Sequence, residues 1–377
     1  TAGSIIDADI SDTTNITAKL IDLKSLSGTI GKLNNSLKIE TQGAIAALNA
    51  IAAGSIFIDE QVNDPRGLNI GYIRSNTGDI VLSVTDAESA GQDLVVGNTA
   101  SIQSMLGAVT LNIGDNVVID SDGEIKAATQ VVISADHGDD PSESTNLPTT
   151  VLIRGSIITP ALSIVTQDDS DEISIANIEV GTVTTVNTAG GSDIVQIGSN
   201  AMPTTSISTS GTNTDGVLNS IAAKITVNTG LGDLDQLFID DSGDFIANVG
   251  AASSVAVTGL GMTNGGIRYS GVDSLVLSLG SAGNEVNVTS TQSDVLTTIN
   301  GGQATDIFNI YNSANQVNEI AGLLEIFGAT NGDCSDTLNV IDSGDAVDNF
   351  GLLTVCHLYT SDASDEYRAS NLVGYTP

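Results

Sequence analysis

Residues 338–351 read LNVIDSGDAVDNFG, and residues 237–250 read LFIDDSGDFIANVG. Seven of the fourteen positions are identical, including the run Asp-Ser-Gly-Asp, and the two copies begin 101 residues apart. The similarity extends backwards, since NSIAAKI at residues 219–225 precedes the first copy much as NEIAGLL at 318–324 precedes the second. A unit of about a hundred residues that is used at least twice indicates a repetitive β architecture rather than one closed globule.

The composition favours a core built from small and β-branched side chains. The chain has 377 residues, of which 40% are hydrophobic, yet only 3% are aromatic and none is Trp. Stacked Ile, Val, Leu and Ala side chains fit this composition better than large aromatic anchors do. The 40 glycines, with many Asn, Asp, Ser and Thr residues, indicate frequent turns between short strands.

The net charge of −35, from 46 acidic and 11 basic residues, limits the classes of partner. Nucleic-acid binding depends on Lys and Arg, so we expect no nucleic-acid partner, and an acidic surface does not dock on anionic lipid. Two interpretations of the charge stay open. The acidic surface attracts cations such as Ca²⁺, or it keeps a long β protein soluble.

Cysteine and histidine are scarce. Cys334 and Cys356 cannot build a disulfide scaffold, and His137 and His357 offer little material for a histidine-based triad or metal site. We therefore expect no enzyme, with one alternative left open: a polysaccharide-active β-helix that uses a pair of carboxylates.

The sequence contains no apolar run of the length that a membrane helix needs, so we expect no membrane insertion in this segment. The chain begins at Thr1 and shows no basic region followed by an apolar core. We interpret it as an internal fragment of a longer protein.

The first 136 residues alternate between short apolar strands and polar corners. Period-two alternation marks GSIFID at 54–59, GDIVLSVT at 78–85, GAVTLNI at 107–113 and QVVIS at 130–134 as half-buried strands. These segments begin 24, 29 and 23 residues apart, which suits successive coils of a parallel β-helix. QGAIAALNAIAA at 42–53 departs from the pattern, and we expect small residues packed at a tight corner there rather than a short helix.

We expect four regions along the chain. Residues 1–136 form β-helix rungs, and the polar segment HGDDPSESTNLP at 137–148 is a loop or linker. Residues 149–355 form a β-solenoid with repeat units of about a hundred residues. Residues 356–377 have no rung pattern and are interpreted as an atypical, non-native tail.

A cassette of strand, Gly-rich corner, acidic residue and second strand recurs in the second half. It occurs at 185–199, 226–240, 298–312 and 325–342, for example as TVNTAGGSDIVQIGS and TINGGQATDIFNIYN. Six acidic residues in these corners are the candidate metal ligands: Asp193, Asp233, Asp235, Asp306, Asp333 and Asp336.

The corners resemble degenerate forms of the calcium-binding repeat of the repeats-in-toxin family, in which Gly permits a tight turn and Asp carboxylates of adjacent coils share a hard cation. The resemblance implies Ca²⁺ as the cofactor. The corners here lie tens of residues apart, so a site would be complete only if folding stacks one corner above another. The alternative is that these aspartates lie in turns that face solvent.

Other acidic motifs are better explained as turns and loops. DSGD at 241–244 and at 342–345 ends a strand, and DSDG at 120–123 is similar. A calcium loop of the EF-hand kind that starts at Asp120 would need Glu at its twelfth position, where the chain has Val131. Asp168, Asp169, Asp171 and Glu172 are expected to form a charged loop.

The first half carries a second resemblance. SGTIGKLNNSLKIET at 27–41, followed by GSIFIDE at 54–60 and GDIVLSV at 78–84, resembles rungs of filamentous-haemagglutinin-type adhesins and of giant bacterial surface proteins. The resemblance implies an all-β, elongated, right-handed parallel β-helix, or β-solenoid. It also implies an extracellular, cell-surface location, a structural or adhesive role as a stiff display rod, and cell-surface molecules or glycans as partners. The alternatives are a calcium-dependent export and folding module, and the polysaccharide-active enzyme.

Overall fold

The structure is a computed structural model of the 377-residue chain. It describes residues 3–8, 13–43, 46–61, 67–86, 91–138, 148–198, 213–230, 234–263, 265–328 and 335–346.

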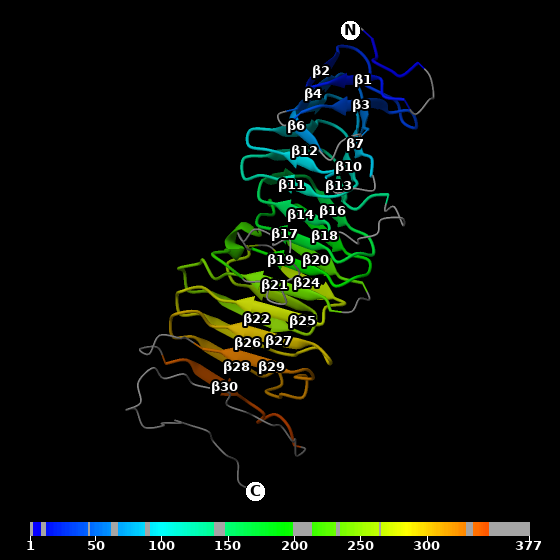
Figure 1. Ribbon diagram of the computed structural model, residues 1–377. Coiled ribbons are helices and arrows are strands. Elements are labelled where there is room, and N and C mark those ends of the chain that lie inside the picture. Colours follow the sequence, from blue (N-terminus) through cyan, green and yellow to red (C-terminus); the bar gives the residue numbers. More distant parts are fainter. Residues whose placement is uncertain are drawn as a thin grey trace.

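Two sheets of fifteen strands each make up the described part of the chain, stacked along one long axis from β1 to β30 (Figure 1). In order, the first sheet contains β1 (Ile16–Ala18), β3 (Leu37–Thr41), β5 (Ile56–Glu60), β7 (Ile80–Val84), β10 (Val109–Ile113), β13 (Val131–Ser134), β16 (Ala161–Val165), β18 (Val183–Asn187), β20 (Lys224–Asn228), β24 (Gly266–Ser270), β23 (Ala256–Gly259), β22 (Val249–Ser253), β26 (Glu285–Val288), β28 (Ile307–Ile310) and β30 (Thr337–Val340).

The second sheet divides into two arms at β6 (Leu68–Ser75), because the start of β6 pairs with β8 and its end pairs with β9. The long arm continues from β6 through β8 (Leu94–Val96), β11 (Val117–Ile119), β14 (Thr150–Ile153), β17 (Glu172–Ile175), β19 (Ile194–Ile197), β21 (Gln236–Asp240), β25 (Ser274–Ser278), β27 (Leu296–Asn300) and β29 (Leu324–Phe327). The short arm contains β2 (Leu20–Ser25), β4 (Ala47–Ala52), β6, β9 (Ser101–Ser104), β12 (Glu124–Ala127) and β15 (Ser156–Ile158). One short 3₁₀ helix, η1 (Leu218–Ser220), precedes β20.

The chain visits the sheets in a fixed order. From β7 to β16 each circuit uses three strands, one from the first sheet, one from the long arm and one from the short arm. After β16 the short arm ends, and each circuit uses one strand from each sheet, except that the chain passes through β22, β23 and β24 of the first sheet between β21 and β25. Each strand pairs in parallel with its equivalent one circuit away, so Ile56, Ile80, Val109 and Val131 lie in one row. The segment spacing read from the sequence is therefore confirmed as the circuit length.

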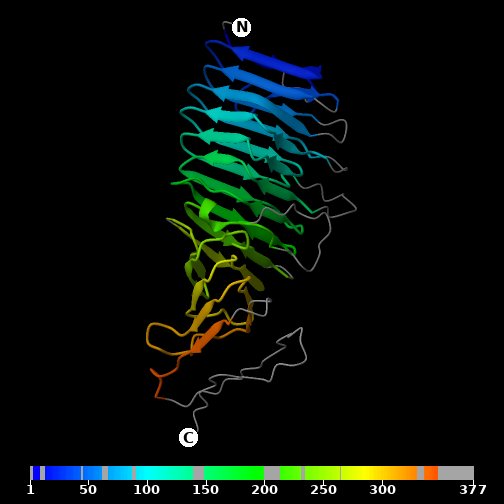
Figure 2. The same cartoon turned by 90° about the vertical axis from the view of Figure 1, so that its left-hand side faces the viewer.

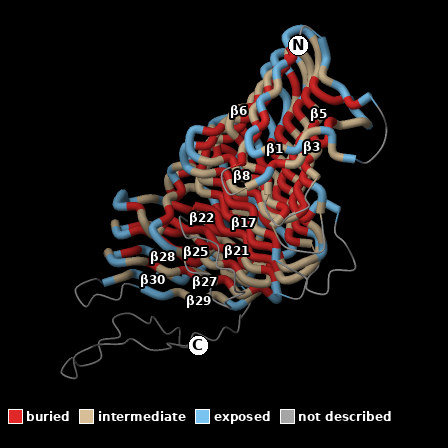
Figure 3. Tube along the Cα trace, turned by 45° about the horizontal axis from the view of Figure 1, so that its top comes forward, coloured by how far each residue is buried: buried red, intermediate tan, exposed pale blue. Residues whose placement is uncertain are grey.

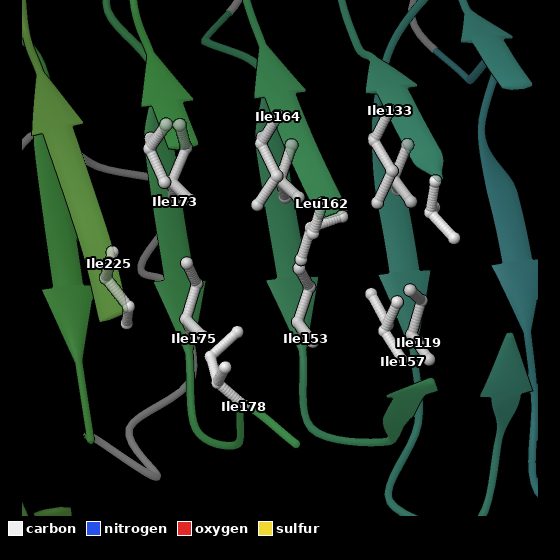
Figure 4. Packing of buried hydrophobic residues seen from close by; sticks show 14 of the residues in the cluster. Ile119, Ile133, Ile153, Ile157, Leu162, Ile164, Ile173, Ile175, Ile178 and Ile225 are labelled. Carbon is white, nitrogen blue, oxygen red and sulfur yellow. The ribbon is translucent and has the colours of Figure 1, made fainter. Parts of the chain in front are cut away.

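Buried residues run along the inner part of the stack from end to end (Figure 3). They form a core of stacked aliphatic side chains between the sheets. One column on the first sheet runs through Ile58, Leu82, Leu111, Ile133, Ile164, Val186 and Val227, all of them fully buried. Figure 4 shows Ile133 and Ile164 of this column, together with Ile119, Ile153 and Ile175 of the long arm. Like side chains stack at each level because in-register parallel pairing places every residue above its equivalent.

The Ala-rich segment at 42–53 corrects one expectation. Residues Ala47–Ala52 form strand β4, which pairs with β2 and β6, so this part of the segment is neither a corner nor a helix. Ala50 and Ala52 point inward and are fully buried. Alternation of inward and outward residues overrides the helix propensity of alanine here, because the strand completes the main-chain pairing of its neighbours.

A hairpin interrupts the parallel order of the first sheet. β22 and β23 are antiparallel and lie between β24 and β26. The long-arm strands that follow β24 and β26 in the chain, β25 and β27, pair directly with each other. The first sheet thus gains two strands, about 10 Å at the usual strand spacing, that the second sheet lacks. The stack must bend at this level, and the strands in yellow and orange are turned relative to those in blue and green (Figure 2).

Both sheets continue past the predicted linker at 137–148. β11 and β13, which precede the segment, pair with β14 and β16, which follow it. Most of the linker, the end of the third region and the whole tail at 356–377 lie outside the described residues, so the four region boundaries stay predictions.

The architecture is thus all-β, with long parallel sheets and almost no helix, and it is consistent with a β-solenoid. Within the described ranges, no helix has the length and apolar character that crossing a bilayer requires.

Candidate functional site: the acidic corners

Folding stacks the acidic corners into columns. The corners that precede β19 and β21 lead from the first sheet to the long arm, and they lie on successive circuits. The corners that precede β28 and β30 also lie on successive circuits, but they lead from the second sheet to the first. The condition for ligands shared between circuits, one corner above another, is therefore met at both edges.

Four aspartates form the first column, which we call the Asp ladder: Asp171, Asp193, Asp235 and Asp273. Each is the last residue before a long-arm strand, and the backbone N–H of each of the first three donates to the carboxylate of the next aspartate. The N···O distances are 2.9 Å from Asp171 to Asp193, 3.0 Å from Asp193 to Asp235 and 2.8 Å from Asp235 to Asp273. The carboxylates thus take up N–H groups that precede the regular strand pairing.

The second column, which we call the Asx ladder, has the same geometry at the opposite edge: Asn248, Asn284, Asp306 and Asp336. Each precedes a strand of the first sheet. The side-chain oxygens of Asn284, Asp306 and Asp336 accept the N–H of the preceding member, over 3.0 Å, 2.6 Å and 2.8 Å in turn. Asp193, Asp235, Asp306 and Asp336 were singled out by sequence, whereas Asp171, Asp273, Asn248 and Asn284 were missed as ladder members. The signal they share is a position directly before an apolar strand.

Burial overturns the expectation of aspartates in turns that face solvent. Asp193, Asp235 and Asp306 have no exposed surface, and Asp336 is half-buried. The expected charged loop at 168–172 is corrected as well, because Asp171 is a buried ladder member and Glu172 begins β17 within the sheet. In-register stacking covers each carboxylate with the circuits on either side of it.

Burial also changes the acidity of these groups. It raises the pKa of Asp171 to about 8 and the pKa of Asp193 to about 6, and the carboxylate of the neighbouring circuit adds to each rise. Burial raises the pKa of Asp306 to about 6, with a contribution from Asp336, and it raises the pKa of Asp235. A buried carboxylate without a cationic partner favours its protonated form.

A column of threonine hydroxyls faces the Asp ladder. The hydroxyls of Thr166, Thr188 and Thr229 lower the pKa of Asp171, Asp193 and Asp235 respectively. None of these three hydroxyls has a partner at hydrogen-bond geometry. Both carboxylate oxygens of Asp171, and one oxygen atom each of Asp193, Asp235 and Asp306, also lack a hydrogen-bond partner. These oxygen atoms are the groups in the corners that remain able to bind a proton or a cation.

The calcium assignment stays a prediction. Asp233 and Asp333 lie outside the described residues. In the part of the chain that the structure describes, no group of three or more His, Cys, Asp or Glu side chains is arranged to hold a metal ion. Any cation at Asp193, Asp235 or Asp306 would use the carboxylate oxygen that the backbone N–H leaves unoccupied.

The DSGD motif of the first repeat copy clamps two segments of chain together. Asp241 accepts the N–H of Leu218 at 3.0 Å, and Asp244 accepts the side-chain amide of Asn219 at 3.1 Å. The N–H of Gly243 donates to the carbonyl of Gly216 at 2.8 Å, and a Cβ atom at this position would collide with the backbone of Asp215. The motif therefore holds the segment around η1 against the end of β21.

The second copy repeats the clamp with equivalent residues. The N–H of Val317 donates to Asp342 at 3.3 Å, and the amide of Asn318 donates to Asp345 at 2.6 Å. These contacts explain why Asn219 and Asn318 recur upstream of the motif. The interpretation of both DSGD copies and of 120–123 as turns is confirmed.

The two repeat copies lie on opposite sheets, because the first begins in β21 of the long arm and the second in β30 of the first sheet. The side-chain ladder changes edge in the same way, because the Asp ladder ends at Asp273 and the Asx ladder begins at Asn248 on the opposite edge. The β22–β23 hairpin lies at the level where both changes occur. A two-sheet circuit presents the same local pattern on either sheet, so one cassette fits both.

Sequence reasoning also missed two rows of polar side chains on the outer face of the first sheet. Asn287, Asn309 and Asn339 are linked through their side-chain amides at 3.0 Å and 2.8 Å. Asn187, Asn228 and Ser270 form a similar row, with both distances at 2.8 Å. The signal was an asparagine at a fixed place in successive cassettes.

Of the cysteines and histidines, the structure describes His137 alone. Cys334, Cys356 and His357 lie outside the described residues. His137 lies beside Ser134, with 3.3 Å between its Nδ1 atom and the serine Oγ atom, on the exposed side of the first sheet.

Comparison with protein families, with curated proteins and with solved structures found no match to this chain.

Stability should fall as pH rises from acid to mildly alkaline. Burial moves the pKa of Asp171 from 3.8 to about 8, so between these values the folded state holds a proton that the unfolded state releases. The free energy of unfolding, measured by denaturant titration at several pH values, should be higher near pH 5 than near pH 8. Asp171→Asn should flatten this dependence, whereas Asp168→Asn, at an exposed neighbouring aspartate, should leave it unchanged. Stability that rises with pH would contradict the account.

The two DSGD copies provide a matched pair for testing the clamp. Asp244 is 3% exposed and accepts from Asn219, Ile246 and Asn248, whereas Asp345 is half-exposed. Asp244→Ala should lower the free energy of unfolding by about 2–3 kcal/mol, and Asp345→Ala by less than about 1 kcal/mol. Equal losses in urea denaturation would show that burial of the clamp does not determine its contribution.

Proposed function

We propose that this chain is a structural and adhesive segment of a large secreted cell-surface protein, wound as a right-handed parallel β-helix that acts as a stiff display rod. The observation that carries the proposal is the first sheet, whose fifteen strands stack along one axis above a continuous aliphatic core. Such a stack grows in one dimension, and each circuit is stabilised mainly by its neighbours. Corners and outer sheet faces are then free to vary and to meet partners.

Three features support a role based on length and surface. The cassettes place polar corners on both edges of the stack, where a rod would display them. The excess of acidic residues opposes self-association of long exposed sheets. The clamps and Asn rows tie neighbouring circuits to each other, which stiffens a rod against local opening.

Solution scattering tests the rod. At the usual strand spacing, the first sheet alone is about 70 Å long, so the largest dimension of the particle should be at least that, with an elongated distance distribution. Antibodies raised against the chain should label intact cells that produce the parent protein. A near-spherical particle, or labelling only after the cells are opened, would overturn the proposal.

A calcium-dependent folding module is the second candidate, because buried carboxylate oxygens in the stacked corners lack hydrogen-bond partners. A hard cation bound between circuits would satisfy them and would stabilise the folded state in proportion to its concentration.

Calcium should then raise the melting temperature where equal magnesium does not. Asp235→Asn should remove most of the effect. The amide oxygen of Asn can still accept the N–H of Asp193, but the negative charge that would bind the cation is lost. A calcium response no larger than that of magnesium, or one unchanged in Asp235→Asn, would reject this candidate.

A further inference from the structure

The outer face of the short arm carries an unusual column of basic side chains. In-register pairing aligns Lys24, Arg74 and Lys126 in one row across the strands, and Ile51 and Gln103 lie between them. The side chains of Lys24 and Lys126 are exposed and that of Arg74 is half-buried, while their strand neighbours Ile73 and Ile125 point into the core. The cations therefore recur on every second strand, about 9–10 Å apart.

This placement stands out against the composition of the chain. Three of its 11 basic residues share one column, in a protein that has 46 acidic residues. Screening limits the reach of distant carboxylates to about 8 Å at physiological ionic strength, so a ligand on this face experiences mainly the local charges.

The neighbouring column supplies polar and aromatic groups and two carboxylates, which lie on the same strands as Lys24 and Lys126 and are each hydrogen-bonded to a side-chain amide. Asp22 accepts the side-chain amide of Asn49 at 2.6 Å, and Glu124 accepts that of Gln103 at 2.8 Å. Tyr72 lies in the same column as Glu124 and is half-buried on the outer face. The face thus combines a row of cations, amides held in place and one aromatic side chain.

We propose that the outer face of the short arm binds a linear anionic polysaccharide, with its carboxylate or sulfate groups on Lys24, Arg74 and Lys126. Charge complementarity identifies the occupant, because regularly spaced cations on the outer face of a parallel sheet match a polymer whose anionic groups repeat along one side. A globular acidic protein would not present its charges in such a row.

Arg74 occupies the centre of the row and contributes geometry as well as charge. Its guanidinium can bind a carboxylate or a sulfate through two parallel hydrogen bonds, and its Nε atom is buried without a hydrogen-bond partner. Tyr72 lies two residues before Arg74 on β6 and on the same outer face, where its ring can pack against a sugar. Lys24 and Lys126 then hold the polymer on either side.

The inference deepens the adhesive role proposed above by naming a class of partner, and it rests on that role. The rod proposal and the polysaccharide proposal can be rejected independently of each other. Particle shape and surface labelling test the rod, whereas polymer binding tests this face.

The test is binding of the full chain to polygalacturonate and to heparin, which present carboxylate and mainly sulfate groups respectively, with neutral dextran as control. The triple variant Lys24→Gln, Arg74→Gln, Lys126→Gln should weaken binding at least about tenfold, because each substitution removes a charge-assisted contact. The matched variant Lys32→Gln, Lys224→Gln, Arg268→Gln changes the net charge equally at exposed sites elsewhere, and it should change binding less than about twofold.

Lys126→Gln alone, at an exposed side chain, should give an intermediate loss, so the test does not depend on the fold of the triple variant. Preference for one polymer identifies the anionic group that the face recognises. Absence of binding to both polymers at low salt, or equal loss in the two triple variants, would overturn the proposal.

Discussion

In-register parallel pairing of the main chain is the interaction on which the rest of the structure depends. It places each side chain about 4.8 Å above its equivalent on the next circuit, so every position becomes a column. Apolar positions become continuous columns such as the one through Leu111, Ile133 and Ile164. A polar group that enters the interior must find its partner in the same column, and the Asp and Asx ladders satisfy this condition by accepting the N–H of the neighbouring circuit.

The same constraint explains how so acidic a chain accommodates buried aspartates. Asp193 and Asp235 accept backbone N–H groups, but no basic side chain contributes to the shift of either pKa. Instead, the carboxylate of Asp235 raises the pKa of Asp193, and that of Asp273 raises the pKa of Asp235. Burial of unpaired carboxylates costs free energy, which protons or a hard cation can offset. The corners are thus the part of the molecule whose stability is most sensitive to pH and to ions, while the aliphatic columns are indifferent to both.

Much of the fold could be predicted from sequence, because alternation shows which residues of a strand face inward. The segments at 54–59, 78–85 and 107–113 match β5, β7 and β10, and their spacing equals the pairing register. The local pattern does not show which strand lies next in space. The β22–β23 hairpin, the division of the second sheet at β6 and the exchange of sheets between the two repeat copies therefore had no sequence signal.

The acidic corners were located correctly, but their environment was not. The alternative of turns that face solvent is wrong, because Asp193 and Asp306 are buried acceptors of backbone hydrogen bonds, while the alternative of shared cation sites stays a prediction. Burial of a corner depends on the corners stacked on either side, and these lie 22 to 42 residues away in the chain. No window of local sequence contains that information.

Disulfide trapping tests the central claim, in-register stacking, most directly. Thr185 and Thr226 are direct partners on β18 and β20, at a separation of Cα atoms that a disulfide can span, whereas Asn228 lies two residues further along. With Cys334 and Cys356 replaced by serine, Thr185→Cys with Thr226→Cys should oxidise readily in the folded protein, and Thr185→Cys with Asn228→Cys should not. Equal crosslinking of the two pairs, or preference for the second, would contradict the register and the ladders that depend on it.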